Sequence, residues 1–195
     1  MQCRQVLSIN LLPDDVLLGI FDFCEPRDLP QHQYSKKGME IWWQTLVHVC
    51  RRWRTPCFGS PRRLDLRLGC APGTPVRDTL DVWPTLPLAI STYDSPTRGR
   101  LENMLAVLEH SHRVCQIRLL DLSTPQMEKV LAAMQVPFPE LKELVLQVMS
   151  NDDTAVVPDS FLGGSAPRLR HFFSFRVPFP GLPKLLLSAT HLVEL

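Results

Sequence analysis

The chain has 195 residues, of which 45% are apolar and 21% charged, a globular composition that excludes intrinsic disorder. Its 21 Lys and Arg residues balance its 20 Asp and Glu residues, which argues against a protein that binds nucleic acid or an anionic membrane. No apolar run approaches the ~18 residues of a membrane span. The amino terminus lacks the apolar core and cleavage site of a secretory signal, so we expect a soluble protein of the cytoplasm or nucleus.

Cysteine usage supports this expectation, and proline usage indicates how the chain is divided into elements. The six cysteines are scattered and form no CxxC pair, which favours small buried side chains over a disulfide framework. The 18 prolines are about twice the usual share of ~5%. Such a chain is expected to form many short elements with rigid joints.

The first expected helix spans about residues 14–24, within LPDDVLLGIFDFC. Pro13 suits the start of a helix, and Asp14 and Asp15 complement the positive end of its dipole. A polar, proline-containing loop from Pro26 to Glu40 follows, and EIWWQTLVHVCRRWR then predicts a second helical stretch limited by Pro56.

An apolar strip lies at the leading edge of this segment, in Leu11, Leu12, Pro13, Val16 and Ile20. Such a strip suggests docking on another protein. It is equally consistent with burial under the residues from 61 onward, and the pattern alone leaves the two alternatives even.

These residues resemble the F-box family. The family pattern begins with Leu-Pro, here Leu12-Pro13, and a first helix, and it ends in Val-Cys-basic-x-Trp, here 49–53 within VCRRWR. The loop at 26–40 departs from the pattern because it is longer and more polar than usual, and we interpret it as a tolerated surface insertion. The resemblance covers about a quarter of the chain.

A recurring unit follows in the second half of the chain. RRLDLRLGC alternates Leu64, Leu66 and Leu68 with charged residues and predicts a strand, and residues around 98–114 predict a helix. Four later segments each begin with a similar leucine-rich strand pattern: VCQIRLLDL, LKELVLQV, LRHFFSF and HLVEL. Their first positions are 114, 141, 169 and 192, and the intervals of 27, 28 and 23 between them fall within the 20–29 of leucine-rich repeats.

The segments between these strands predict short helices. Thr124 is the expected N-cap of the first and Pro125 lies in its first turn. PDSFLGG predicts a single turn closed by Gly163, and LPKLLLSAT a third helix. The Asn or Cys expected after each strand is absent, so the repeats are degenerate. An α/β domain with partly fortuitous periodicity is the alternative.

Nearly the whole chain resembles the F-box proteins of mushroom-forming (basidiomycete) fungi, in which an F-box precedes irregular leucine-rich repeats. This resemblance implies a fold between α+β and α/β: a small three-helix F-box at 10–60, a connecting or first repeat-like segment at 61–112, and degenerate repeats at 113–195. The repeats end inside a strand pattern with no polar cap, so we expect a truncated solenoid.

Searches for catalytic chemistry give little. GxGxxG, P-loop, GxSxG and HExxH motifs are absent from the sequence. A metal site at His48, Cys50 and Cys57 is disfavoured because helical residues two apart do not share a face. Cys115 with His110 or His112 lacks a nucleophile motif. The sequence therefore predicts no metal, no cofactor and no enzymatic activity.

The resemblance implies a non-catalytic adaptor of an SCF-type cullin–RING ubiquitin ligase, which docks on the small Skp-type linker and brings a substrate to the ubiquitin-carrying enzyme. Nucleic acid and membrane are not expected partners. Matched residue by residue, the family pattern places these residues at the linker: Leu12, Pro13, Val16, Leu17, Ile20, Val49, Cys50, Arg51 and Trp53. For Trp53, packing in the F-box core is the slightly favoured alternative.

Two other functions stay open at this point. In the first alternative, the chain is a leucine-rich-repeat interaction scaffold and the F-box-like segment is only its N-terminal cap. In the second, the chain is a hydrolase or transferase with an unrecognised site. The substrate itself is not predicted. Its binding surface is expected on the strands, with these side chains projecting between the buried leucines: Arg118, Lys142, Glu143, Gln147, Arg170 and Ser174.

Overall fold

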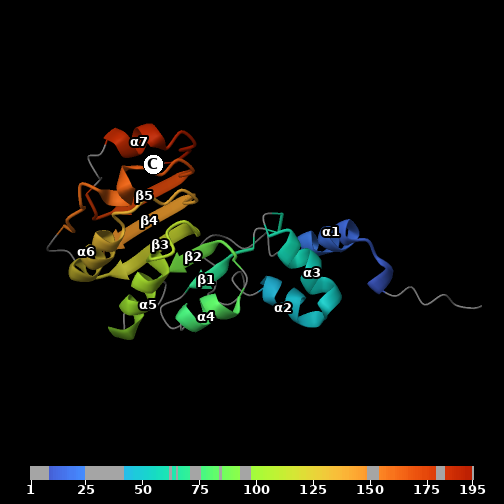
Figure 1. The fold of residues 1–195 in the computed structure, drawn as a ribbon. Helices are drawn as coiled ribbons and strands as arrows, with labels where there is room; N and C mark the ends of the chain where they lie inside the picture. Colours follow the sequence, from blue (N-terminus) through green and yellow to red (C-terminus); the bar gives the residue numbers. More distant parts are fainter. Residues whose placement is uncertain are drawn as a thin grey trace, which may run out of the picture. The chain divides into compact units, whose positions relative to one another are not determined.

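A computed structural model describes residues 9–24, 42–61, 63–64, 66–70, 76–83, 85–92, 98–148, 154–178 and 183–194. The chain divides into two compact units, residues 1–67 (unit 1) and 68–195 (unit 2), which are described separately (Figure 1). The expected loop at 26–40 lies outside the described residues. No helix in the described ranges is both long and apolar enough to cross a membrane.

Unit 1 is helical. A 3₁₀ turn, Ile9–Leu11, precedes α1, Asp14–Cys24, and α2, Trp42–Val49, is followed by α3, Arg51–Gly59. The helix expected at 14–24 is confirmed, with both aspartates in its first turn. Its inner face supplies Leu17 and Phe21 to a core completed by Trp43 and other apolar side chains.

The second helical stretch differs from the prediction because it breaks at Cys50. This residue is extended, with φ −162° and ψ 169°, and acts as the N-cap of α3. Pro56 does not end the helix, which continues to Gly59. Pro56 lies inside α3, and both Pro56 and Cys57 are buried in the core of unit 1.

Unit 2 is built on a five-stranded sheet in which every pair of neighbouring strands is parallel and strand order follows the chain. The expectation of a mixed α/β fold is therefore confirmed for this part of the chain. The strands are β1, Leu68–Cys70; β2, Leu88–Ser91; β3, Val114–Leu122; β4, Glu143–Val148; and β5, His171–Phe175.

The strand register has the spacing expected from the sequence. Gln116 pairs with Glu143, Glu143 with His171, and His171 forms an isolated parallel bridge to Glu194. These pairings repeat the intervals of 27, 28 and 23 that separate the four recurring segments. β2 extends the same arrangement toward the amino terminus, although its proline-rich surroundings concealed it in the sequence.

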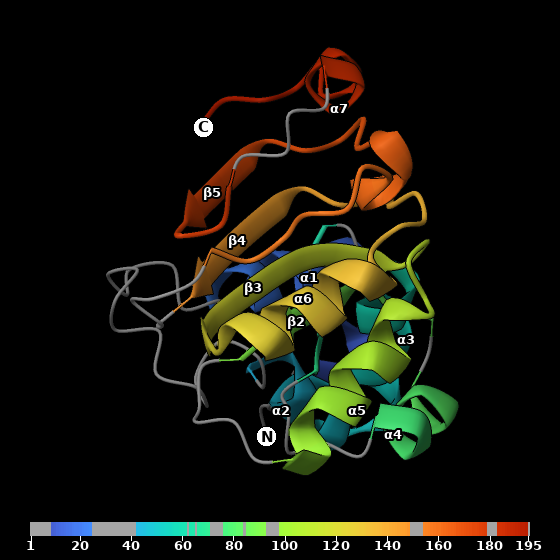
Figure 2. The same ribbon diagram turned by 90° about the vertical axis from the view of Figure 1, so that its left-hand side faces the viewer.

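The connections between strands carry helices. They are α4, Val76–Val82; α5, Arg98–Leu108; α6, Thr124–Ala133; a 3₁₀ turn, Phe161–Gly164; and α7, Pro183–Ser188. Figure 2 shows α4, α5 and α6 covering one face of the sheet. On β3 and β4 the buried residues Ile117, Leu119, Leu144 and Leu146 alternate with partly exposed ones, so one sheet face is packed and the other is open.

Two local predictions need adjustment. Ser123, not Thr124, is the N-cap of α6. The backbone N–H of Ser123 (3.1 Å) and its hydroxyl (2.9 Å) both donate to the side-chain oxygen of Gln126. Thr124 is instead buried. Gly163 does close the turn predicted in PDSFLGG, with φ +60°.

Candidate functional site

Unit 1 exposes apolar side chains along α1 and the segment before it. Val16, Ile20 and Phe23 follow one another at helical spacing, and Leu11 precedes them; Phe23 is 92% and Leu11 74% exposed. We call these four residues the α1 strip. It lies one position out of phase with the buried residues Leu17 and Phe21, so α1 has two apolar faces, of which the core covers one.

Arg52 of α3 holds the segment that leads into α1. Its Nη2 donates to the carbonyl oxygen of Leu12 at 2.6 Å, and its guanidinium forms an ion pair with Asp14. Arg63 adds a second ion pair to α1, with Asp22 at 3.5 Å. The orientation of the Leu12-Pro13 segment is therefore fixed from the carboxyl-terminal part of the unit.

Three arginines, Arg51, Arg52 and Arg54, lie in the first turn of α3. The Nε of Arg54 donates to the carbonyl oxygen of Val47, near the end of α2, at 3.0 Å. Arg51 is exposed.

The residues matched to the linker surface differ in exposure. Pro13, Val16, Ile20, Val49 and Arg51 are exposed, and Leu12, Cys50 and Trp53 are half-buried. Leu17 corrects the expectation: it is fully buried, since the helical turn directs it into the core of unit 1 rather than onto the α1 strip. The sequence pattern assigned both Val16 and Leu17 to the linker surface, because both faces of α1 are apolar.

Trp53 packs inside unit 1. Its ring lies 4.9 Å from that of Phe21, between centroids, at an interplanar angle of 53°. Its Nε1 atom is buried and has no hydrogen-bond partner in the described structure. In contrast, Nε1 of Trp43 donates to the carbonyl oxygen of Arg67 at 3.1 Å.

The open side of the sheet in unit 2 is the second candidate site. We call it the sheet face and define it by the outward residues of β3, β4 and β5: Gln116, Arg118, Glu143, Val145, Gln147, His171, Phe173 and Phe175. The register aligns them in rows across the strands, polar at the strand beginnings and apolar on β5 further along.

The carboxylates of this face are already engaged. Glu143 accepts a hydrogen bond from Gln116 Nε2 at 2.7 Å and from Arg118 Nε at 2.6 Å, one on each oxygen. Glu194 lies 3.2 Å from Nδ1 of His171. These contacts cross between neighbouring segments in two separate groups, one from β3 to β4 and one from β5 to Glu194.

The predicted substrate residues divide three ways. Arg118, Glu143 and Gln147 belong to the sheet face. Lys142 and Arg170 are exposed at the positions directly before β4 and β5, and the Arg170 N–H donates to the Lys142 carbonyl at 2.8 Å. Ser174 is a correction: strand alternation and its pairing with buried Leu146 put it on the packed face.

Sequence reasoning missed the aromatic part of the sheet face. Phe173 is 51% and Phe175 45% exposed, whereas Phe172 between the strand start and Phe173 is buried. The signal was present in HFFSF, because adjacent residues of a strand must point to opposite faces. The arginine at 176 lies over the Phe175 ring, 5.2 Å from its centroid.

The alternatives based on chemistry find little support in the geometry. Within the described ranges no group of three or more His, Cys, Asp and Glu side chains could hold a metal ion. Cys57 is buried, and burial raises its pKa to about 11, which opposes the thiolate that a metal or a nucleophilic reaction requires. Cys115 is buried on β3 with its thiol directed at the Leu88 carbonyl, and its neighbour His112 is exposed.

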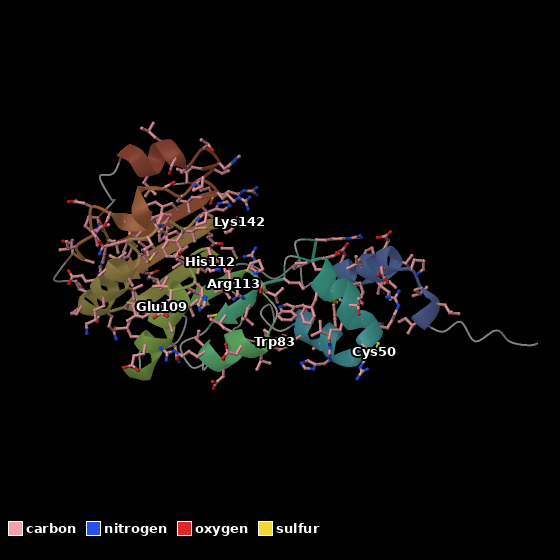
Figure 3. The ribbon with its side chains drawn as sticks, in the orientation of Figure 1. Cys50, Trp83, Glu109, His112, Arg113 and Lys142 are labelled. Carbon is pink, nitrogen blue, oxygen red and sulfur yellow. The ribbon has the colours of Figure 1, made fainter. Side chains whose placement is uncertain are left out.

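Arg113 has a structural role. Its Nε and Nη2 donate to the Leu86 carbonyl at 3.1 and 3.0 Å, before β2. Burial lowers the pKa of the guanidinium, and the nearby Cys70 opposes this shift. Figure 3 shows Arg113 and Lys142 on the side of unit 2 away from α6.

Comparisons of the chain with protein-family models, with curated proteins and with solved structures give no match.

Proposed function

We propose that this chain is a substrate-recognition adaptor of an SCF-type cullin–RING ubiquitin ligase. Unit 1 docks on the Skp-type linker subunit as an F-box, and unit 2 holds a protein substrate as a degenerate leucine-rich-repeat solenoid. The chain performs no bond chemistry. It acts in the cytoplasm or nucleus by raising the effective concentration of the substrate near the ubiquitin-carrying enzyme.

The observation that carries this proposal is the α1 strip beside Leu12-Pro13. A small helical unit with its own buried core still exposes Leu11, Val16, Ile20 and Phe23. Water-exposed apolar side chains that adjoin one another are typical of protein–protein contacts. Arg52 fixes the Leu12-Pro13 segment at their edge, which prepares the strip for a partner without an ordering cost.

The register of unit 2 supports the second half of the proposal. Leu68 pairs with Leu88 and Ala89 with Gln116, so the first two strand offsets are 20 and 27, and the later ones are 27, 28 and 23. All of these offsets match the period of leucine-rich repeats, which is roughly 20–29 residues. Each strand–helix unit buries its apolar side chains against the next, as in a solenoid.

The linker interaction is tested by co-expressing the chain with the Skp-type linker of its host and analysing the complex by gel filtration. We expect a stable one-to-one complex. Leu12→Ala/Pro13→Ala should weaken it by about tenfold or more, because apolar anchors at the centre of an interface contribute ~2 kcal/mol or more each. Val16→Asp/Ile20→Asp should abolish it.

Val82→Asp is the matched control, since Val82 is exposed on α4 of unit 2, far along the chain from the α1 strip. It should leave the complex intact. Circular dichroism of each variant separates loss of binding from unfolding. A folded chain that ignores the linker would refute the adaptor function and would favour the repeat scaffold with an N-terminal cap.

A further inference from the structure

We propose that Ser60, which caps the carboxyl-terminal end of α3, is a phosphorylation site that weakens docking of unit 1. The modifying enzyme is a protein kinase that selects a serine followed by proline and arginine. The effect on docking rests on the proposed function, because it concerns the α1 strip, whereas the modification itself does not. Three features carry the inference: the sequence after Ser60, its place at a helix end, and the turn that joins it to Arg63.

The residues that follow Ser60 are Pro61, Arg62 and Arg63. Proline directly after the acceptor and a basic residue three positions on form a substrate pattern of the kind that protein kinases read. In the reaction the Ser60 hydroxyl oxygen forms a bond to the γ-phosphorus of ATP, and the bond from that phosphorus to the β–γ bridging oxygen breaks. ADP leaves, and the hydroxyl proton passes to a base of the kinase.

Ser60 is open to this modification. It is half-exposed, and an added Cβ at its neighbour Gly59 would meet no atom within 4 Å, so the end of α3 is uncrowded. Among the described residues its hydroxyl forms no hydrogen bond. In contrast, the Thr55 hydroxyl before Pro56 donates to a carbonyl of the preceding turn at 3.2 Å, and Thr124 before Pro125 is buried.

The helix end makes a negative charge at Ser60 costly. The carboxyl-terminal end of a helix carries a partial negative charge, and a phosphate adds about −1.5 to −2 charges beside it. The last turn of α3 contains fully buried Cys57, whose carbonyl accepts the Ser60 N–H at 3.2 Å. It also contains Phe58, whose ring lies 6.2 Å from that of Trp43 between centroids. Phosphorylation should therefore loosen a turn that packs in the core of unit 1.

Arg63 connects this position to α1. Its backbone N–H donates to the Ser60 carbonyl at 3.2 Å, so the two residues are the ends of one turn. Its guanidinium now lies 3.5 Å from the Asp22 carboxylate and 4.0 Å from that of Asp15. Exposed ion pairs of this length are weak, whereas a phosphate offers three oxygens and can take both parallel N–H groups of an arginine. The phosphate should therefore draw Arg63 away from α1.

The α1 strip is the part of unit 1 that this change affects. Among the described residues, the ion pairs of α1 come from Arg52 at its first turn and from Arg63. Without Arg63, the orientation of the strip is less fixed, and binding must pay a larger ordering cost. We expect phosphorylation of Ser60 to weaken binding to the Skp-type linker by about fivefold or more.

Treatment of the full chain with ATP and a purified proline-directed kinase of the cyclin-dependent class tests the inference. Tandem mass spectrometry locates the phosphate. Urea unfolding followed by tryptophan fluorescence reports on unit 1, and biolayer interferometry on immobilised Skp-type linker reports on docking. We expect phosphate on Ser60, a lower unfolding midpoint of unit 1 and weaker linker binding.

Variants separate this site from others. Ser60→Ala should abolish both shifts. Thr74 and Ser95 are followed by the same pattern, belong to unit 2 and lie outside the described residues. Thr74→Ala/Ser95→Ala is therefore the matched control and should keep both shifts. In Asp15→Asn/Asp22→Asn, which removes the α1 partners of Arg63, phosphorylation should lower the unfolding midpoint less than in the parent chain.

Three outcomes would overturn the inference: no phosphate on Ser60 while a standard peptide of the same kinase is modified, full phosphorylation that leaves the unfolding midpoint unchanged, or equal or tighter linker binding by the phosphorylated chain. The last result, in a chain that binds the linker, refutes this inference alone. A chain that ignores the linker in both states, but whose unit 1 is destabilised by phosphate on Ser60, refutes the adaptor function and supports the modification site.

Discussion

Replacing each of two tryptophans of unit 1, buried Trp43 and half-buried Trp53, by phenylalanine should have very different effects on stability. Trp53 has a buried Nε1 without an acceptor, whereas Nε1 of Trp43 donates to the Arg67 carbonyl. A buried donor left unpaired costs about 1–3 kcal/mol, and a satisfied neutral hydrogen bond contributes about 0.5–1.5 kcal/mol. The two substitutions remove the same atoms. At Trp53 they eliminate an unfavourable contribution to folding stability, and at Trp43 a favourable one.

For Trp53→Phe the lost ring volume costs about 1–2 kcal/mol, and removal of the orphan donor returns a similar amount. The ring contact with Phe21 at 4.9 Å is kept in part. We expect a net change within about 1 kcal/mol of zero. For Trp43→Phe the same volume loss adds to the lost hydrogen bond, so unfolding should become easier by about 2–3 kcal/mol.

Urea unfolding followed by tryptophan fluorescence measures this difference. Three of the four tryptophans, at 42, 43 and 53, lie in unit 1, so the signal reports mainly on that unit even when one is replaced. In thermal melts a difference of ~2 kcal/mol corresponds to roughly 8–16 °C for a unit of this size. Equal destabilisation by the two variants would show that Trp53 Nε1 is satisfied in solution and that the reasoning is wrong.

Two further predictions concern the backbone and a thiol. Gly163→Ala should destabilise unit 2 by about 2–4 kcal/mol, because φ is +60° and an added Cβ would lie 2.7 Å from the Pro137 nitrogen. Gly164→Ala, at φ +69° in open space, should cost only about 1–2 kcal/mol. Thermal melts that rank the two variants the other way would contradict this prediction. Because the pKa of Cys57 rises from 9.0 to about 11 on folding, the unfolded chain loses this proton first, so stability should fall as pH rises from 9 to 11. Urea titrations across this range should show a shallower decline for Cys57→Ala, and an unchanged slope would count against a buried neutral thiol.

Local sequence signals were sufficient for some elements. Pro13, Asp14 and Asp15 specify the start of α1 through the missing donor of proline and the charge of the aspartates, and these effects act within one helical turn. The strand intervals of 27, 28 and 23 were likewise visible, because buried leucines recur wherever a strand adds to the sheet.

Other features depended on contacts between distant residues. The break at Cys50 follows from the packing of α2 and α3 around Trp43 and Cys57, which a continuous helical pattern cannot show. Leu17 and Val16 are both apolar and adjacent, and only the position of the core distinguishes the buried one from the exposed one.

For unit 2 the sequence by itself determined the segments that form β3, β4 and β5 and how far apart they lie, whereas β2 emerged only in the structure. The tertiary structure decided which side of each strand is open: it exposed Phe173 and moved Ser174 to the packed face. It also decided which charges meet in cross-strand pairs, such as Arg118 with Glu143 and His171 with Glu194. The physical reason is that hydrophobic periodicity is written along the chain, whereas ion pairs and solvent exposure depend on neighbours that only the sheet register brings together.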